Sequence, residues 1–486
     1  MFIAAHEWFA PVLEESTVNA NTLAELYKGL SEDFESEELK HKARLFLESE
    51  IAKLDASACD LPAQAHELED WMQTSSQPAT SRYGQYLEER KAGSPRRYFS
   101  NRAHALYFLR AVAPTKLVDG AWVYGLLNHW RNPRFADLIR TYFEELGEGS
   151  NDKNHVLIYR QLLTRYGLDP VDDLAESFYT QGLIQLALAG HAEEYLPEVI
   201  GFNLGYEQLP LHLLITAYEL NELGIDPYYF TLHVTVDNAN TGHARRAVQA
   251  VLDNIPKLGS ADEFWRRVRI GYGLSNAGVG TTDVIDGFNI DREVVRIFAH
   301  KSEAGHGAHS DYCRVGGRNV NDWLARKEDI PEFLSALEKA RWIKRGVPVE
   351  QSRFWGLLQG SRAEMFGVFT SYELQVIHDW ILGDASRDGH SYAEIDSANS
   401  VPRRASFRVA ARLAATRSGM SLDLHTQSPS TSMLDSDLQS LTQQLPTLDA
   451  ADQASILVKA MAPSQHWTPA GLHATKLFGR LFFSGA

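Results

Sequence analysis

The sequence predicts an all-α helical bundle, and two observations lead to this prediction. Apolar residues recur at helical spacing, as at Leu23, Leu26, Tyr27 and Leu30, which fall on one face of a helix. No segment shows alternating strands joined by hairpin turns. Hydrophobic residues make up 44% of the chain and charged residues 23%, which is typical of a folded globular protein and argues against wholesale disorder.

Composition and charge limit the location and the partners. The net charge of −16 repels nucleic-acid phosphates and anionic lipid, so we expect neither a nucleic acid nor a membrane as partner. No apolar run reaches the roughly 18–20 residues needed to span a bilayer. The first residues lack a basic signal-peptide region, and Cys59 and Cys313 cannot form a disulfide framework. We therefore expect a cytoplasmic protein.

At roughly 100–200 residues per domain, a chain of 486 residues allows about two to four domains. Residues 1–90 are predicted to be a helical N-terminal extension, with a linker at 74–81 (TSSQPATS) and a candidate dimerisation surface. Residues 95–257 form the densest helical region and are predicted to be the functional core. A helical C-terminal region follows at 258–385, and 386–486 is predicted to be a polar, partly flexible tail whose last apolar segment docks on the rest.

The segment Tyr229–Ala244 contains the first candidate metal ligands. His233 and Asp237 are four residues apart and share a helix face, an arrangement that can hold a transition metal. On an ideal helix His243 lies about 80° from that face at about 100° per residue, so it joins the same site only if the helix unwinds near Gly242. The alternative is a hydrogen-bonded core histidine with Asp237 as its partner.

Two upstream segments add acidic and imidazole side chains. Glu144 and Glu145 end one predicted helix and His155 begins the next, so that a carboxylate and an imidazole can converge across the loop. Glu207 follows the apolar stretch VIGFNLGY, where a buried acid requires a partner or a metal. The alternatives are solvated glutamates with a capping His155, a salt bridge at Glu207, and Glu198 as the acid in its place.

Together these segments supply three carboxylates and three imidazoles from separate helices, which suits a carboxylate-bridged pair of irons. The candidate metal ligands are Glu145, His155, Glu207, His233, Asp237 and His243.

The order and spacing of these motifs resemble the haem-oxygenase-like diiron oxidases and oxygenases, also described as iron-containing redox enzymes. In that family a Glu precedes a His by seven to ten residues, a second Glu follows in a Tyr-Glu-x-x-Pro-like context, and His-x-x-x-Asp-x-x-His ends the series. The resemblance covers about residues 95–257. It departs at the last histidine, because that position is Asn240 here and the chain offers His243 instead.

The resemblance implies a haem-oxygenase-like helical bundle that binds two Fe(II) ions and uses O2 as co-substrate. It implies an oxidoreductase acting on a small, amino-acid-derived metabolite by N-oxygenation, desaturation or oxidative C–C cleavage, in specialised-metabolite (natural product) biosynthesis. No catalytic residue beyond the metal ligands follows from it. An external electron donor and a homodimer are compatible with the resemblance.

Other interpretations compete with this one. His300, His306, His309, Asp311 and Cys313 form a second cluster, whose glycine-rich flanks favour a loop over a metal site. A haem protein needs only one axial histidine and leaves the acids unexplained. A metal-free helical scaffold or interaction protein is the main alternative from another class. Hydrolase and nucleotide-dependent chemistry lack their motifs, since the chain has no G-x-S-x-G, Walker A or H-E-x-x-H sequence.

Overall fold

The computed structural model describes residues 22–168, 174–208, 210–236, 242–360, 363–383 and 435–484, and it confirms the all-α prediction. Within these residues the only strands are the two-residue pair β1 (Arg314–Val315) and β2 (Arg318–Asn319), which are antiparallel. None of the helices in the described part of the chain combines the length and the apolar composition that a membrane crossing requires.

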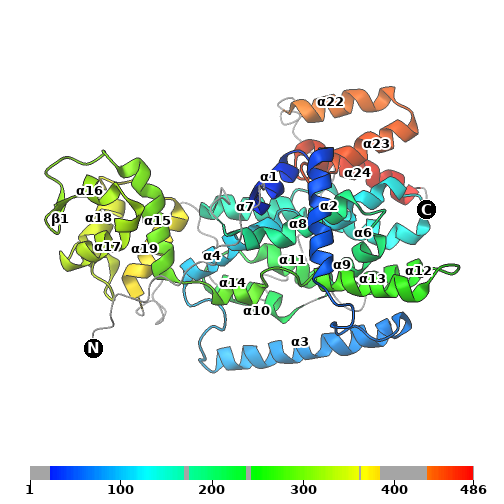
Figure 1. The fold of residues 1–486 in the computed structure, drawn as a ribbon, viewed down its shortest axis with the longest axis horizontal. Helices are drawn as coiled ribbons and strands as arrows, with labels where there is room; N and C mark the ends of the chain where they lie inside the picture. Colours follow the sequence, from blue (N-terminus) through cyan, green and yellow to red (C-terminus); the bar gives the residue numbers. More distant parts are fainter. Residues whose placement is uncertain are drawn as a thin grey trace.

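The helices follow one another through four stretches of the chain (Figure 1). The N-terminal helices are α1 (Leu23–Glu32), α2 (Glu37–Ala52), η1 (Ala65–Glu67) and α3 (Leu68–Lys91). The central helices are α4 (Arg102–Ala111), α5 (Ala113–Lys116), η2 (Ala121–His129), η3 (Pro133–Phe135), α6 (Ala136–Glu145), η4 (Gly147–Gly149), α7 (His155–Tyr166), η5 (Glu176–Tyr179), α8 (Thr180–Gly190), α9 (Leu196–Tyr206), α10 (Leu211–Glu222), α11 (Tyr228–Val236), α12 (His243–Asn254) and α13 (Ala261–Leu274). The next are α14 (Thr281–Asp286), α15 (Ile290–Gly305), α16 (Val320–Leu324), η6 (Lys327–Asp329), α17 (Ile330–Lys339), η7 (Val349–Gln351), α18 (Arg353–Gln359) and α19 (Ser371–Leu382). The C-terminal helices are α22 (Ser436–Gln444), η9 (Leu445–Thr447), α23 (Ala450–Ala460) and α24 (Pro469–Ser484).

Two hydrophobic cores organise these helices. The first core lies among α1, α2, η2, α6, α8, α9, α12, α13 and the C-terminal helices, and includes Trp122, Tyr142, Phe202, Val268 and Phe478. The second core lies among α4, α7, α10, α11 and α14–α19, and includes Phe108, Tyr159, Tyr229, Ile297 and Ile377. Helices α15–α19 form a separate lobe at the left of Figure 1, and α22–α24 lie at the opposite upper side.

The expected linker at 74–81 is wrong, because these residues belong to the continuous helix α3. Leu68, Met72 and Tyr86 of α3 are buried, and the Tyr86 hydroxyl donates a hydrogen bond to Glu219 in α10 at 2.7 Å. Contacts with α10 and α12 therefore hold α3 in place. Tertiary packing of this kind overrides the weak helix propensity of a Ser- and Thr-rich segment.

The C-terminal region contains both docked helices and a stretch outside the described residues. The segment HTQSPSTS, predicted to be flexible, lies outside them. The last apolar segment forms α24, where Ala474 and Phe478 are fully buried in the first core. The ring of Phe478 lies 5.8 Å from that of Phe143 in α6.

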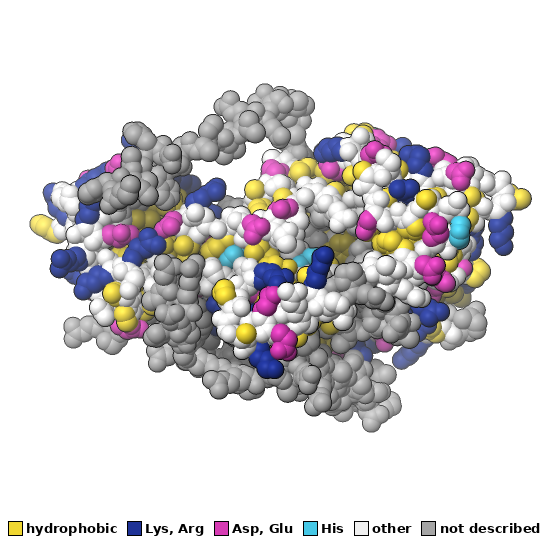
Figure 2. Space-filling model, turned by 90° about the horizontal axis from the view of Figure 1, so that it is seen from below, with side chains coloured by type: hydrophobic (Ala, Val, Ile, Leu, Met, Phe, Trp, Pro, Cys, Tyr) yellow, Lys and Arg dark blue, Asp and Glu magenta, His cyan; other side chains and the backbone are white. Residues whose placement is uncertain are grey.

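The charged surface is mixed rather than dominated by one sign on the face that Figure 2 shows. Acidic and basic side chains alternate over its described residues, with hydrophobic side chains between them along the middle of the face.

Helices α9 and α13 approach each other so closely that glycine is required at the contact. A Cβ atom built on Gly201 would lie 1.9 Å from the carbonyl oxygen of Val268. A Cβ on Gly271 would lie 2.1 Å from the carbonyl oxygen of Glu198. Because helix α9 leads directly to Glu207, this contact also fixes the position of that acid.

We expect Gly201→Ala to destabilise the protein by about 1–3 kcal/mol, since the added methyl group overpacks a backbone contact. Urea unfolding measures this change. Gly84→Ala is the matched control, because a Cβ at Gly84 in α3 meets nothing within 4 Å. The control should be neutral or stabilising by about 0.5–1 kcal/mol. Equal effects of the two substitutions would contradict the close α9–α13 packing.

Candidate metal centre

Two groups of buried side chains share one glutamate. Asp119, Glu145, His155 and His233 each offer a ligand atom, and these atoms all lie within 4.8 Å of one another. In a second group, Glu145, Glu207 and His243 also place their ligand atoms within 4.8 Å of one another. All six residues are buried, with His243 fully so. Glu145 therefore lies where one carboxylate can serve both groups.

The ends of helices bring most of these residues together. Glu145 is the last residue of α6, and His155 and His243 are the first residues of α7 and α12. Glu207 follows α9 directly. Asp119 lies in the short connection between α5 and η2, next to Gly120 at φ +81°. A Cβ on Gly120 would lie 2.8 Å from that of Glu145, so glycine allows this connection to approach α6.

His233 is oriented by a hydrogen bond to its own helix. Its Nδ1–H donates to the carbonyl oxygen of Tyr229 at 2.9 Å, which leaves Nε2 to face Asp119 Oδ2 at 3.2 Å. The Tyr229 hydroxyl donates to the same carboxylate oxygen at 2.5 Å. His155 Nδ1 contacts Glu145 Oε2 and lies 3.8 Å from Asp119 Oδ2. Two imidazole nitrogens thus converge on two carboxylates.

His243 is held between an outer and an inner carboxylate. Its Nε2–H donates to Glu144 Oε2 at 2.8 Å, while Nδ1 lies 2.8 Å from Glu207 Oε2 and 3.5 Å from Glu145 Oε1. Arg246 donates to Glu144 at 2.5 Å and fixes the outer carboxylate. A carboxylate behind the imidazole is the usual support of a metal-binding histidine.

The unpaired atoms of the cluster fit divalent metal ions. Asp119 Oδ1 and Glu207 Oε1 are buried and lack a hydrogen-bond partner within the described structure, whereas Glu145 Oε2 and His155 Nδ1 form an ion pair with each other. In a neutral His233 or His243, the nitrogen that faces the acids carries a lone pair. A proton or a cation must therefore lie between this nitrogen and the carboxylate oxygen opposite it. Imidazole nitrogen with carboxylate oxygen is a donor set that suits iron, manganese or zinc.

The acids and imidazoles strongly affect each other's protonation. Burial opposes the charge of His155, but Glu145 and Asp119 outweigh it and raise its pKa to about 10. Burial raises the pKa of Glu207, and the nearby Glu145 adds to this effect. Burial also opposes the charge of Glu144, yet contacts with His243 and an arginine lower its pKa to about 2. Glu144 is therefore ionised, whereas the raised pKa values of His155 and Glu207 favour protonated side chains, whose protons a metal would displace.

Five of the six predicted ligands lie in the cluster. The sixth, Asp237, lies outside the described residues, as does Asn240. His233 lies in α11 (Tyr228–Val236) and His243 is the first residue of α12, so the two histidines belong to different helices. The backbone at Gly242, directly before His243, is extended rather than helical, which is the interruption that His243 required.

The alternative acids and histidines have other partners. Glu198 forms an ion pair with Arg267 at 2.6 Å, outside the cluster. Glu144 belongs behind His243 rather than among the inner carboxylates. In the second histidine cluster, His306 Nδ1 contacts the carbonyl oxygen of Asn321 at 3.2 Å, and no group there meets the geometric criterion for a metal site within the described residues.

Sequence reasoning missed Asp119. The only signal is an isolated acid in the otherwise apolar stretch LVDGAWVYG, before a glycine that can adopt positive φ. Such a residue has no spacing relation to the later motifs, because it reaches the cluster through a turn rather than along a helix face.

The C-terminal segment supports the loop between Glu145 and His155. The Tyr142 hydroxyl donates to the carbonyl oxygen of Met461 at 2.7 Å. Asn154 caps α7 through Leu157 N at 2.9 Å, and its side-chain amide lies 3.2 Å from His466 Nδ1. Residues more than 300 positions later in the chain than this loop thus fix both of its ends.

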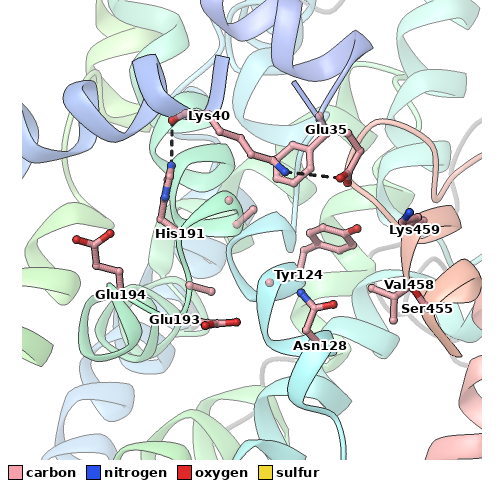
Figure 3. Close-up of a pocket in the computed structure, with 15 residues that line it drawn as sticks. Glu35, Lys40, Tyr124, Asn128, His191, Glu193, Glu194, Ser455, Val458 and Lys459 are labelled. Atoms are coloured by element: carbon pink, nitrogen blue, oxygen red, sulfur yellow. Dashed lines mark hydrogen bonds and ion pairs between the residues drawn. The ribbon is translucent and has the colours of Figure 1, made fainter. Parts of the chain in front are cut away.

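A polar cavity lies elsewhere, between α2, η2, α8 and α23 (Figure 3). Its volume is about 330 Å³, and no residue of the buried cluster lines it. Lys40 forms an ion pair with Glu35 at 3.6 Å across it, and His191 Nε2–H donates to the carbonyl oxygen of Lys40 at 2.9 Å. These contacts join Lys40, Glu35 and His191 in the cavity wall.

A comparison with known proteins matches one part of the chain to a family model. No curated protein and no solved structure gave a significant match. Residues 106–276 match the family model described as iron-containing redox enzyme, and this range contains every described member of the cluster. Over these residues the chain resembles the iron-containing redox enzymes, as its motifs predicted, with the all-α architecture expected of a haem-oxygenase-like fold.

Proposed function

We propose that the protein is a non-haem diiron oxidoreductase that uses O2 to oxidise a small metabolite. The observation that carries this proposal is the position of Glu145, which is common to two buried groups that each contain imidazole nitrogen and carboxylate oxygen. A shared carboxylate between two such groups is the arrangement of a bridged metal pair in helical bundles. The family match supports iron as the metal.

The charges of the cluster suit two divalent ions. Asp119, Glu145 and Glu207 supply three negative charges against four positive charges of two Fe(II) ions. Asp237 is proposed as a fourth acid on the basis of its position in the sequence. Buried carboxylates are costly without compensating cations, and one bound ion would leave part of the set uncompensated.

The residues of this chain would hold, orient and shield the irons. His155 and His233 would bind one ion with Asp119, and His243 and Glu207 the other, with Glu145 between them. Tyr229 and Glu144 orient the imidazoles through the hydrogen bonds described above. When bound, the iron pair supplies the electrons and the Lewis acidity that O2 activation requires.

The finer features rest on the family resemblance. We propose an amino-acid-derived substrate, an oxidation of the N-oxygenation, desaturation or C–C cleavage type, and an external electron donor. The competing metal-free scaffold is disfavoured by two buried carboxylate oxygens, Asp119 Oδ1 and Glu207 Oε1, that lack hydrogen-bond partners within the described residues. A haem protein is disfavoured because the inward-facing imidazole nitrogens lie against carboxylates rather than an open face.

Iron stoichiometry tests the shared-carboxylate arrangement. We expect the wild-type chain to bind two irons after anaerobic Fe(II) loading, and Glu145→Gln to lose both because it weakens both groups. His233→Ala and Glu207→Gln should each retain at most one iron and lose iron-dependent O2 consumption. Elemental analysis after desalting and an oxygen electrode provide the two measurements, with circular dichroism to verify that the helices remain.

Two glutamate variants control this experiment. Glu198→Gln is the same substitution at a buried, ion-paired site outside the cluster, so it should keep two irons. Glu144→Gln should keep the stoichiometry at saturation but weaken iron binding by about 10–100-fold, as expected for a residue behind a ligand. Wild-type iron content in Glu145→Gln would rule out the bridged pair.

The metal-free protein should lose stability as the pH rises. The pKa of His155 is raised from 6.5 to about 10, so its stabilising protonation is complete below about pH 6.5 and is lost as the pH rises through 10. The raised pKa of Glu207 acts in the same direction. Thermal unfolding at pH 6.5 and about pH 9.5 measures the difference, which Zn(II) loading should reduce.

His155→Gln is the control for this pH effect. It removes the titrating imidazole while keeping a polar side chain, and should flatten the pH dependence of the metal-free protein. An equally steep dependence in His155→Gln would show that other groups cause the effect.

A further inference from the structure

Lys116 is a cation beside the carboxylate cluster. It ends α5, three residues before Asp119. Its Nζ donates to the Tyr206 hydroxyl oxygen at 3.2 Å and lies 5.2 Å and 5.8 Å from the ring centres of Tyr206 and Tyr229. Tyr206 precedes Glu207, and Tyr229 donates to Asp119, so both aromatic rings border the centre.

The hydrogen-bonding capacity of this group is not used up by the protein. Lys116 has three N–H donors, and within the described residues only the one to Tyr206 has an acceptor, with no carboxylate at ion-pair distance. The Tyr206 oxygen accepts that bond, and its own O–H has no acceptor in the described structure. The ring of His212, in the first turn of α10, likewise has no hydrogen bond to a described residue. These groups are therefore available to a ligand that reaches them.

These three residues form the boundary between the buried cluster and accessible space. Lys116, Tyr206 and His212 each keep part of their surface accessible, whereas Asp119, Glu145, Glu207 and Tyr229 are at most 3% exposed. A small molecule that approaches the cluster on this side therefore meets the ammonium, the hydroxyl and the imidazole before it meets the acids.

The charge at this boundary is positive. Burial opposes the charge of Lys116, but Tyr206 and Asp119 outweigh it and raise its pKa, so the ammonium stays protonated. Burial, and then the charge of Lys116, lower the pKa of His212 to about 4, so that imidazole is neutral near pH 7. With two divalent ions bound, the acids are occupied with the metals and Lys116 has no counter-ion.

We propose that Lys116 and Tyr206 bind the carboxylate of a monoanionic substrate at the edge of the metal centre, with His212 as a neutral part of the same wall. One full positive charge with N–H and O–H donors matches one carboxylate, whereas a phosphate dianion would leave a charge uncompensated. This inference rests on the proposed function, because it places the substrate against the metals of that site.

The test uses the full chain loaded with Mn(II), whose unpaired electrons accelerate the relaxation of nearby protons. The probe is acetate, and the relaxation rate of its methyl protons is compared with that of acetamide, the uncharged analogue of similar shape. Mn(II) content is measured in each sample. We expect acetate to be relaxed more strongly than acetamide, and its affinity to fall about tenfold or more in Lys116→Met, since a hydrogen bond to a charged group is lost.

Two further variants complete the test. Tyr206→Phe keeps the ring, removes the hydroxyl and should reduce acetate binding, and it decides the question if Lys116→Met does not fold. Lys42→Met removes an exposed lysine that pairs with Glu38 on α2, and should leave acetate binding unchanged.

The outcomes separate this inference from the proposed function. A wild-type protein that binds no Mn(II) would reject the metal centre and this inference with it. Normal Mn(II) content with equal relaxation of acetate and acetamide would overturn the carboxylate site alone. Undiminished acetate relaxation in Lys116→Met would also overturn it, because acetate would then bind the metal without this side chain. Where Lys116→Met does not fold, undiminished relaxation in Tyr206→Phe has the same meaning.

Discussion

The burial of three carboxylates at one point is the constraint on which the rest of the structure depends. Asp119, Glu145 and Glu207 are each at most 3% exposed, and an uncompensated buried charge costs several kcal/mol. The surrounding imidazoles and Lys116 provide partial compensation, and atoms without partners remain. The divalent cations proposed above would supply the missing charge and the missing contacts.

The cluster lies where the two hydrophobic cores meet. His155 and His233 come from helices of the second core, whereas Glu145, Glu207 and His243 come from helices of the first. Bound metal ions would therefore connect the two cores through ligand bonds, and metal binding would be coupled to the packing of one core on the other. The tight α9–α13 contact at Gly201 contributes to this coupling, because α9 carries Glu207 at its end.

Helical periodicity and local motifs predict many of the helix ends and cluster residues from the sequence. The last residue of α6 and the first of α7 were placed correctly, since apolar spacing and the intervening glycines mark both helix ends. Asp119 was not found, because a residue in a turn has no periodic relation to ligands on other helices. The 74–81 segment was assigned wrongly for a related reason: its helix depends on packing against α10 and α12, which local composition does not encode.

The family resemblance explains the inner ligands but not everything that positions them. Residues 106–276 contain the cluster, yet Met461 and His466 lie far outside this range and contact Tyr142 and Asn154 around the loop between Glu145 and His155. The loop that carries Glu145 and His155 at its two ends is therefore held in place by the C-terminal segment. Small shifts of this loop would alter both groups of candidate ligands at once, because Glu145 belongs to both. The connection between α23 and α24 thus supports the candidate metal centre, although it lies outside the matched region.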